Sequence, residues 1–151
     1  MSTQKILKKF DPRRENLLLI LHDLQDNHPQ NYLTEDALDH TAKYLKLTKS
    51  SVYGVATYYS MFSVTPRGRH IIRVCASPVC ELLKSETIIA SIGEHLGIKT
   101  GETTPDGLFT LELSECLGQC QDAPSMMIDK TVYSNLTTDN IREVLDAYRQ
   151  P

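Results

Sequence analysis

Four cysteines in two close pairs are the residues of this chain whose type and spacing could do chemistry. They follow the pattern Cys75-x4-Cys80, a gap of 35 residues, and Cys116-x3-Cys120. Thiolates are soft anionic ligands that suit iron bridged by sulfide, and they also suit structural zinc. Because cysteines are kept reduced in the cytoplasm, such pairs indicate a metal or redox centre there rather than a disulfide framework.

The spacing favours an iron–sulfur cluster over two other classes of site. Zinc on four cysteines stays an alternative and would make the chain an interaction module without a redox role, but zinc ribbons favour two intervening residues. A thiol–disulfide oxidoreductase normally carries Cys-x-x-Cys, which does not occur here. Plant-type ferredoxins space their ligands differently. The sequence therefore predicts an iron–sulfur cluster whose ligands are Cys75, Cys80, Cys116 and Cys120.

Motifs for other chemistry do not occur. The sequence has no GxGxxG, Walker loop, HExxH or nucleophile elbow, so it predicts no nucleotide site and no catalytic residue. Its five histidines are scattered, and they are expected to be solvated or bonded locally. An electron relay is favoured over a complete enzyme.

Charge and hydropathy exclude further partners. The 151 residues carry 16 basic and 19 acidic side chains, a net charge of −3, so no nucleic-acid surface is expected. The basic run from Arg67 to His70 is predicted to be a solvated turn. The longest aliphatic run, Leu17 to Leu21, is too short to span a membrane, and no export signal is evident. A cytoplasmic location is expected.

The first 65 residues contain no cysteine and are predicted to be helical. Asp11 is suited to cap a helix, because Pro12 then occupies the first helical position and loses no hydrogen bond. Thr34 is suited to begin a second helix, since two acidic residues follow it at the positive end of the helix dipole. Apolar residues at helical spacing predict three helices, over about residues 12–26, 34–45 and 50–62.

The chain changes character after a turn at residues 65–68. Short β-branched and apolar runs predict strands over residues 70–74, 109–113, 126–128 and 131–133. Helices are predicted over residues 82–96, ending at Gly97, and from Thr137 or Thr138 to Tyr148. The order β-α-β-β-α fits an α/β sandwich of thioredoxin type. The predicted fold class is α+β, with a helical segment at 1–65 and an α/β domain at 66–151.

Each cysteine pair follows closely after one of these strands. One strand ends directly before the first pair, and the other, with Phe109, Leu111 and Leu113 expected on one buried face, ends two residues before the second. Loops at the same end of a sheet can bring four sulfurs around one small inorganic core. Gly118 lets the second loop fold tightly. The backbone N–H groups of this loop and the start of a helix just after Cys80 are expected to offset the negative charge of the thiolates.

Longer segments around these features resemble a known family. The chain is similar to the thioredoxin-like 2Fe–2S subunits of NAD-linked oxidoreductases, such as the E subunit of NADH–quinone oxidoreductase and its mitochondrial counterpart. Small subunits of NAD(P)-linked electron-bifurcating hydrogenases and of formate dehydrogenases belong to the same family. The resemblance covers about residues 10–149, and its most specific segments are VYGVATYYSMF at 52–62, GETTPDGLFTL at 101–111, CLGQC at 116–120 and AP at 123–124.

The resemblance implies one 2Fe–2S cluster on the four cysteines and a cis bond at Pro124. It also implies a flavoprotein partner that carries FMN, binds NAD(H) and holds a 4Fe–4S cluster, together with a further iron–sulfur, hydrogenase or dehydrogenase subunit. The expected function is one-electron transfer within a soluble electron-bifurcating hydrogenase or formate dehydrogenase. The E subunit of a respiratory NADH–quinone oxidoreductase is the alternative, and the lack of the mitochondrial N-terminal extension favours a bacterial-type subunit.

The helical segment is expected to dock the partner. Its third predicted helix has apolar and aromatic residues around more of its circumference than one buried face requires. Burial of this helix between the two parts of the chain is the alternative, whereas the resemblance favours docking, since aromatic residues and methionine are enriched at interfaces. The residues concerned are Val52, Tyr53, Val55, Ala56, Tyr58, Tyr59, Met61 and Phe62.

Overall fold

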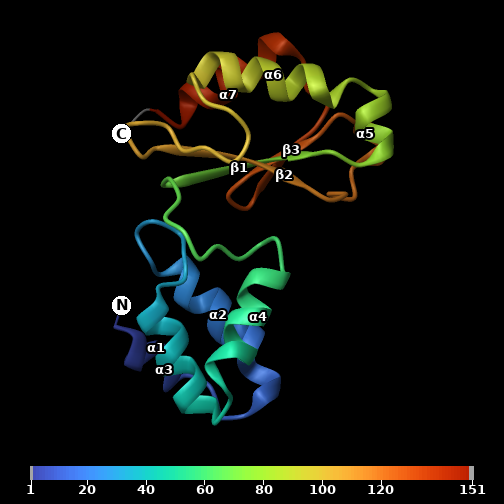
Figure 1. Cartoon of the computed structure of the whole chain (residues 1–151). Helices are drawn as coiled ribbons and strands as arrows, with labels where there is room; N and C mark the ends of the chain where they lie inside the picture. Colours follow the sequence, from blue (N-terminus) through green and yellow to red (C-terminus); the bar gives the residue numbers. More distant parts are fainter. Residues whose placement is uncertain (1, 150–151) are drawn as a thin grey trace. The chain divides into compact units, whose positions relative to one another are not determined.

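The computed structural model describes residues 2–149, which form two compact units. The first unit ends at Arg67 and the second begins at Gly68, two residues after the boundary predicted from the sequence. The predicted combination of a helical bundle followed by an α/β domain is confirmed (Figure 1). The helices of the first unit are α1 (Thr3–Leu7), η1 (Arg14–Asn16), α2 (Leu17–Asp26), α3 (Glu35–Leu45) and α4 (Lys49–Tyr58).

Aliphatic side chains form the core of the first unit. α2 and α3 each turn an apolar stripe inward, as the helical spacing of their leucines predicts. The short α1 is not among the predicted helices, yet it contributes Ile6 and Leu7 to this core. The buried members are Ile6, Leu7, Leu17, Ile20, Leu21, Leu24, Leu33, Ala37, Leu38, Ala42, Leu45, Val52, Ala56 and Phe62.

Of the two helix starts predicted from capping residues in this unit, one is confirmed and one is wrong. The predicted start of α3 is confirmed, because the Thr34 hydroxyl accepts a hydrogen bond from the Ala37 N–H at 3.1 Å. The predicted start at Asp11 is wrong, since α2 begins only at Leu17, after a 3-10 turn. The Asp11 carbonyl instead accepts hydrogen bonds from the Arg13 N–H and the Asn16 side chain, which form a tight turn before the helix.

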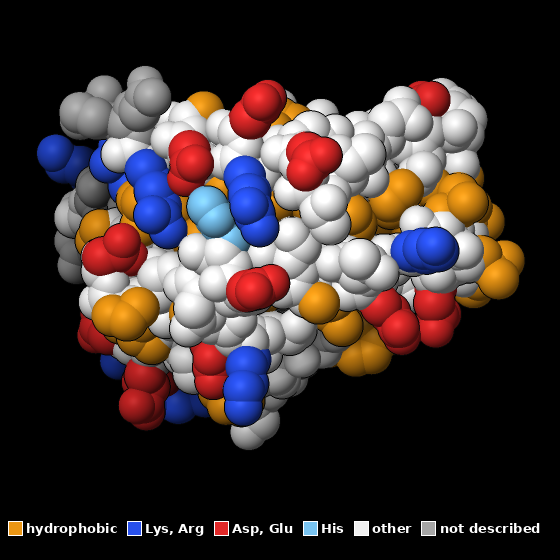
Figure 2. Space-filling model, turned by 90° about the horizontal axis from the view of Figure 1, so that it is seen from above, with side chains coloured by type: hydrophobic (Ala, Val, Ile, Leu, Met, Phe, Trp, Pro, Cys, Tyr) orange, Lys and Arg blue, Asp and Glu red, His pale blue; other side chains and the backbone are white. Residues whose placement is uncertain are grey.

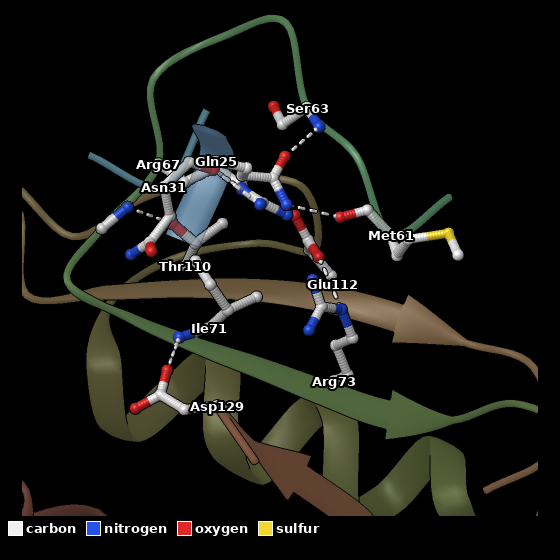
Figure 3. Close-up of polar contacts among 11 residues, drawn as sticks. Gln25, Asn31, Met61, Ser63, Arg67, Ile71, Arg73, Thr110, Glu112 and Asp129 are labelled. Carbon is white, nitrogen blue, oxygen red and sulfur yellow. Dashed lines mark hydrogen bonds and ion pairs between the residues drawn. The ribbon is translucent and has the colours of Figure 1, made fainter. Parts of the chain in front are cut away.

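α4 ends at Tyr58, four residues before the predicted end at Phe62. The helix ends because Tyr59 adopts an extended backbone, with a φ of −87° and a ψ of 122°, and the side chain of Gln25 holds the chain just beyond it (Figure 3). Its amide donates to the Met61 carbonyl at 2.9 Å, and its oxygen accepts from the Ser63 N–H at 2.8 Å. Because the Ser63 N–H bonds to Gln25, it does not bond to the carbonyl of Tyr59, four residues earlier, as it would in a helix that reached Phe62.

The basic run that follows is not the solvated turn that the sequence predicts. Arg67 is only 6% exposed, and its guanidinium donates to the Asn31 carbonyl from Nε at 2.8 Å and from a terminal nitrogen at 2.6 Å (Figure 3). His70 is bound as well, with Nδ1 2.7 Å from the Asp129 carboxylate. Arg67 and His70 therefore make local contacts within the fold and do not form a free basic surface.

The second unit is built on one four-stranded sheet with the strand order β2-β1-β3-β4. β1 runs parallel to β2 and antiparallel to β3, which forms a hairpin with β4. All four strands lie where the sequence predicts them. Their bounds are β1 (His70–Cys75), β2 (Phe109–Ser114), β3 (Met126–Ile128) and β4 (Thr131–Tyr133).

Helices cover one face of this sheet and make the second core (Figure 1). α6 (Ser85–Leu96) ends at Gly97, which has a φ of +70° and is the predicted C-cap. α7 (Thr138–Ala147) begins with a capping box between Thr137 and Asn140, so Thr137 is the cap. The buried members are Ile72, Val74, Ile88, Ile92, Leu96, Ile98, Phe109, Leu111, Met126, Ile128, Leu136, Ile141 and Leu145.

Two predictions for this unit are wrong at the end that carries the cysteines. The helix predicted from Leu82 is broken, because α5 (Pro78–Leu82) and α6 are separated by Lys84, which has a φ of +68°. Leu82, predicted to face the core, is 84% exposed. Leu113 is 48% exposed, unlike the fully buried Phe109 and Leu111 of the same strand. At the end of the sheet that carries the cysteines, apolar side chains are therefore exposed to solvent.

Among residues 2–149, none of the helices combines the length and the apolar character that crossing a membrane requires.

Candidate functional site

The strand register brings the two cysteine loops to the same end of the sheet. In the parallel pair β1–β2, Cys75 lies opposite Ser114, and the Ala76 N–H donates to the Ser114 carbonyl at 3.0 Å. Both strands therefore end side by side, and the chain continues from β1 to Cys80 and from β2 to Cys116. This arrangement confirms that the two loops leave the sheet at one end.

The second loop folds as the sequence predicts. Gly118 has a φ of +77°, a conformation that glycine adopts without steric cost. Its N–H donates to the Cys116 sulfur at 3.4 Å, and the sulfurs of Cys116 and Cys120 are 3.5 Å apart. The tight turn thus places a thiol pair and a backbone donor together at the surface.

The first loop differs from its prediction. Cys80 does not precede a helix but lies within the short α5, where it is 2% exposed. A third segment also reaches these thiols, because β3 is antiparallel to β1 and so begins at the end where β1 finishes. The Cys75 N–H donates to the Ser125 carbonyl at 3.1 Å, and the Ser125 hydroxyl lies 3.8 Å from the Cys80 sulfur. The peptide bond before Pro124 is cis, as predicted.

The pKa values of the thiols depend on one another. Burial acts to raise the pKa of Cys75, but hydrogen bonds from Ser77, Cys80 and the Leu117 backbone outweigh it, so the pKa is lowered. Burial and the hydrogen bond with Cys75 raise the pKa of Cys80.

The exposed thiol of the second loop is affected in the same way. A hydrogen bond with Cys116 is the main cause that raises the pKa of Cys120, and the charges of Cys80 and Cys75 raise it further. Removing a proton from one thiol makes the next harder to remove, because like charges at short range oppose each other. A cation among these sulfurs would relieve that repulsion, since coordinating thiols are deprotonated.

The two pairs differ in their surroundings. Cys75 and Cys80 are buried, while Cys116 and Cys120 are exposed. Apolar side chains gather on the surface at the α5 end of the unit, seen at the right of Figure 2. They include Val79, Leu82 and Leu83, which are 41%, 84% and 50% exposed. The site therefore has a buried half, an open half and an apolar rim.

The chemistry of the donors suits an all-thiolate iron–sulfur group. Four cysteine sulfurs, which are soft donors, come from two loops, and the N–H groups of Gly118 and Leu117 point at sulfurs. The buried Ser114 hydroxyl, beside Cys75 in the register, has no hydrogen-bond partner. In the described part of the chain, no group of three or more His, Cys, Asp or Glu side chains is arranged to hold a metal ion. The assignment of all four cysteines as cluster ligands stays a prediction.

Two histidines of this unit are bonded locally, as the sequence predicts. His70 pairs with Asp129, and His95 Nε2 lies 3.1 Å from the Asp146 carboxylate. Both contacts hold secondary-structure elements together, since one ties β1 to the β3–β4 turn and the other ties α6 to α7.

A family comparison decides what kind of protein carries this arrangement. Residues 3–149 match the family described as thioredoxin-like 2Fe–2S ferredoxin. The chain belongs to this family. A 2Fe–2S cluster is the cofactor expected of it, and the resemblance noted in the sequence is thereby confirmed.

Curated relatives of this thioredoxin-like 2Fe–2S ferredoxin come from several organisms. It is 37% identical over 147 residues to the mitochondrial NADH dehydrogenase (ubiquinone) flavoprotein 2 of Dictyostelium discoideum, and 34% identical over 149 residues to the E subunit of NADH-quinone oxidoreductase from Mycobacterium tuberculosis. The match covers 97% and 99% of this chain but only 60% and 58% of those relatives. The corresponding protein of Aquifex aeolicus is 34% identical and is covered to 89% of its length.

Solved structures show the same fold. A chain of an NAD+-reducing NiFe-hydrogenase in the air-oxidised state superposes with a TM-score of 0.78 over 89% of this chain and 23% of its own length. The sequence identity is 20%, so this likeness concerns the fold.

Sequence reasoning missed the groups that surround the cysteines. Ser77 and Leu117 lie within the two cysteine loops and Ser125 lies outside them, and nothing in their residue types marks them as neighbours of a particular sulfur. Ser125 follows the predicted Pro124, but its place beside Cys80 depends on the antiparallel register of β1 and β3.

Proposed function

We propose that this chain is an electron-transfer subunit that carries one 2Fe–2S cluster on Cys75, Cys80, Cys116 and Cys120. The observation that supports it best is that both cysteine loops leave the sheet at the common end of β1 and β2, with the sulfurs of the second pair 3.5 Å apart. When bound, the cluster supplies one-electron redox chemistry. The chain itself lacks a nucleotide-binding loop, so it is not expected to oxidise NADH alone.

The residues of the chain have separable roles in this proposal. Cys75 and Cys80 hold the buried half, and their low exposure keeps water from that side. Cys116 and Cys120 hold the open half, where an electron can pass to or from a partner. The N–H groups of Gly118 and Leu117 point at sulfurs and so stabilise negative charge on them.

The proposed partner is a flavoprotein subunit that binds FMN and NAD(H) and holds a 4Fe–4S cluster, within an NAD(P)(H)-linked oxidoreductase. The names of the curated relatives support a complex of the NADH dehydrogenase type. A soluble electron-bifurcating hydrogenase or a formate dehydrogenase is proposed on the family resemblance alone. A cytoplasmic location is proposed, because cysteines that ligate a cluster must stay reduced, as they are kept in that compartment.

We further propose that the helical unit docks the partner. α4 has an inward face, with Val52 and Ala56 buried, and an outward face on which Tyr53 and Tyr58 are 52% and 81% exposed. Just beyond the helix, Tyr59 and Met61 are each 36% exposed. Large aromatic and methionine side chains are enriched at interfaces and are costly to leave in water.

Metal and sulfide analysis of the anaerobically purified chain tests the cluster. The expected result is two irons and two acid-labile sulfides per chain, with a one-electron paramagnetic signal on reduction. Serine in place of each cysteine should weaken or abolish the cluster, because an alkoxide is a harder ligand than a thiolate. Colourless protein with stoichiometric zinc, made with ample iron, would refute the proposal.

Co-expression with the proposed FMN-binding partner subunit tests the docking surface. The double variant Tyr53→Ser with Tyr58→Ser should keep its cluster and its melting temperature but lose co-purification. Val132→Thr is the matched control, because Val132 is also exposed, at 41%, but lies on β4 of the other unit. Undiminished co-purification of the tyrosine variant would place the anchor elsewhere.

A further inference from the structure

Ser125 stands out among the groups around the thiols because it is both buried and aimed at a sulfur. It is 1% exposed, and its hydroxyl lies 3.8 Å from the Cys80 sulfur, within hydrogen-bond reach for sulfur. The Ser125 N–H faces the same sulfur. A thiol at Cys80 could donate or accept in this contact, but a thiolate can only accept, so a deprotonated Cys80 makes the Ser125 hydroxyl the donor.

The backbone holds Ser125 in this position. Its carbonyl accepts a hydrogen bond from the Cys75 N–H at 3.1 Å, at the end of β1. The next residue, Met126, pairs with Val74 in the antiparallel ladder and is fully buried. Strand pairing and the buried neighbour Met126 thus fix the backbone of Ser125 beside the two cysteines. The hydroxyl therefore needs no reorganisation to interact with the sulfur.

We propose that Ser125 is a positioning residue that raises the reduction potential of the site by donating a hydrogen bond to the Cys80 thiolate. This inference rests on the proposed function, since it needs Cys80 to be a cluster ligand. One electron enters on reduction, and no bond is formed or broken. The hydroxyl keeps its proton, and its dipole stabilises the extra negative charge that the sulfur then shares. Hydrogen bonds to sulfur are among the groups that set iron–sulfur potentials.

The variant Ser125→Ala isolates the hydroxyl, because it keeps the backbone N–H and carbonyl. A potentiometric titration of the purified full-length chain, followed by paramagnetic resonance, should show a lower potential. The reduction equilibrium constant should fall by about threefold to tenfold, which is about 30 to 60 mV for a one-electron couple. Ser125→Thr keeps the hydroxyl and should restore most of the potential.

A matched control separates this effect from general loosening of the fold. Thr110 is also a buried hydroxyl of the same unit, 3% exposed, and its oxygen accepts from the Gly68 N–H at 2.6 Å. It lies near the start of β2, away from the cysteine loops, so Thr110→Val should lower the melting temperature but leave the potential unchanged.

The possible outcomes distinguish failure of this inference from failure of the proposed function on which it rests. Wild-type protein without iron and sulfide refutes the proposed function itself. A fully loaded Ser125→Ala chain with an unchanged potential refutes only the role of Ser125. An equal shift in Thr110→Val shows a general effect of packing and also refutes it. A shift confined to Ser125→Ala and reversed by Ser125→Thr supports it.

Discussion

Alanine at Gly93 should destabilise the α/β unit although it improves the helix. Gly93 lies within α6, where alanine is favoured over glycine by about 1 kcal/mol. The turn after the helix opposes this gain. The Ile98 N–H donates to the Gly93 carbonyl at 3.1 Å, and a Cβ on residue 93 would lie 2.8 Å from the Ile98 carbonyl oxygen.

The clash is costly because the obstacle is backbone that carries a core side chain. Ile98 is 7% exposed and packs in the same core as Ile72 and Val74 of β1. Moving it away disturbs packing at a cost of about 2 to 3 kcal/mol, the upper part of the range for overpacking. The net loss is about 1 to 2 kcal/mol, or roughly 5 to 15 °C in the melting temperature of a unit of this size.

Calorimetry of the full chain measures this loss, and Gly54→Ala is the matched control. Gly54 also lies inside a helix, α4, but a Cβ there would meet nothing within 4 Å. Gly54→Ala should therefore stabilise the helical unit by about 1 kcal/mol. If both variants are stabilised alike, the contact with the Ile98 carbonyl does not carry the energy assigned to it.

Three further predictions concern the same unit. Gly68→Ala should destabilise it by about 2 to 3 kcal/mol in urea unfolding, because its Cβ would lie 2.8 Å from the Phe109 carbonyl carbon; a loss below about 0.5 kcal/mol would contradict this. Thr137→Ala should cost about 1 kcal/mol by removing the cap of α7, whereas Thr138→Ala, one residue on and exposed, should cost almost nothing. Burial, followed by the hydrogen bond with Tyr148, raises the pKa of Tyr133 to about 12. The folded chain therefore holds this proton more tightly, and the resulting stability is fully present below about pH 10 and lost as the pH rises through about 12. Tyr133→Phe should flatten that loss in urea unfolding measured across this range, and an unchanged slope would speak against it.

Much of the secondary structure could be predicted because local chemistry determines it. Thr34 and Thr137 cap their helices with their own hydroxyls, and Gly97 ends α6 in a conformation that favours glycine. The turn at Gly118 was predictable for the same reason. The cysteine spacing likewise indicated the kind of site, since both pairs follow strands that the residue pattern already reveals.

Other features depend on neighbours far away in the sequence. Beyond the end of α4 at Tyr58, the path of the chain is held by the side chain of Gln25, more than thirty residues earlier, which bonds to Met61 and Ser63. Leu113 continues the alternation of its strand yet is exposed, because the core ends before the strand does. No local pattern contains these partners, so no reading of residue types alone could supply them.

The surroundings of the thiols also depend partly on local sequence and partly on contacts between distant segments. The sequence by itself determined that four cysteines in two loops are available, because their type and spacing are local properties. Only the tertiary structure decided that Cys80 is buried within α5 and that Ser125, 45 residues later, lies against it. The cause is strand pairing, since the registers of β1 with β2 and β3 bring three separate segments to one end of the sheet.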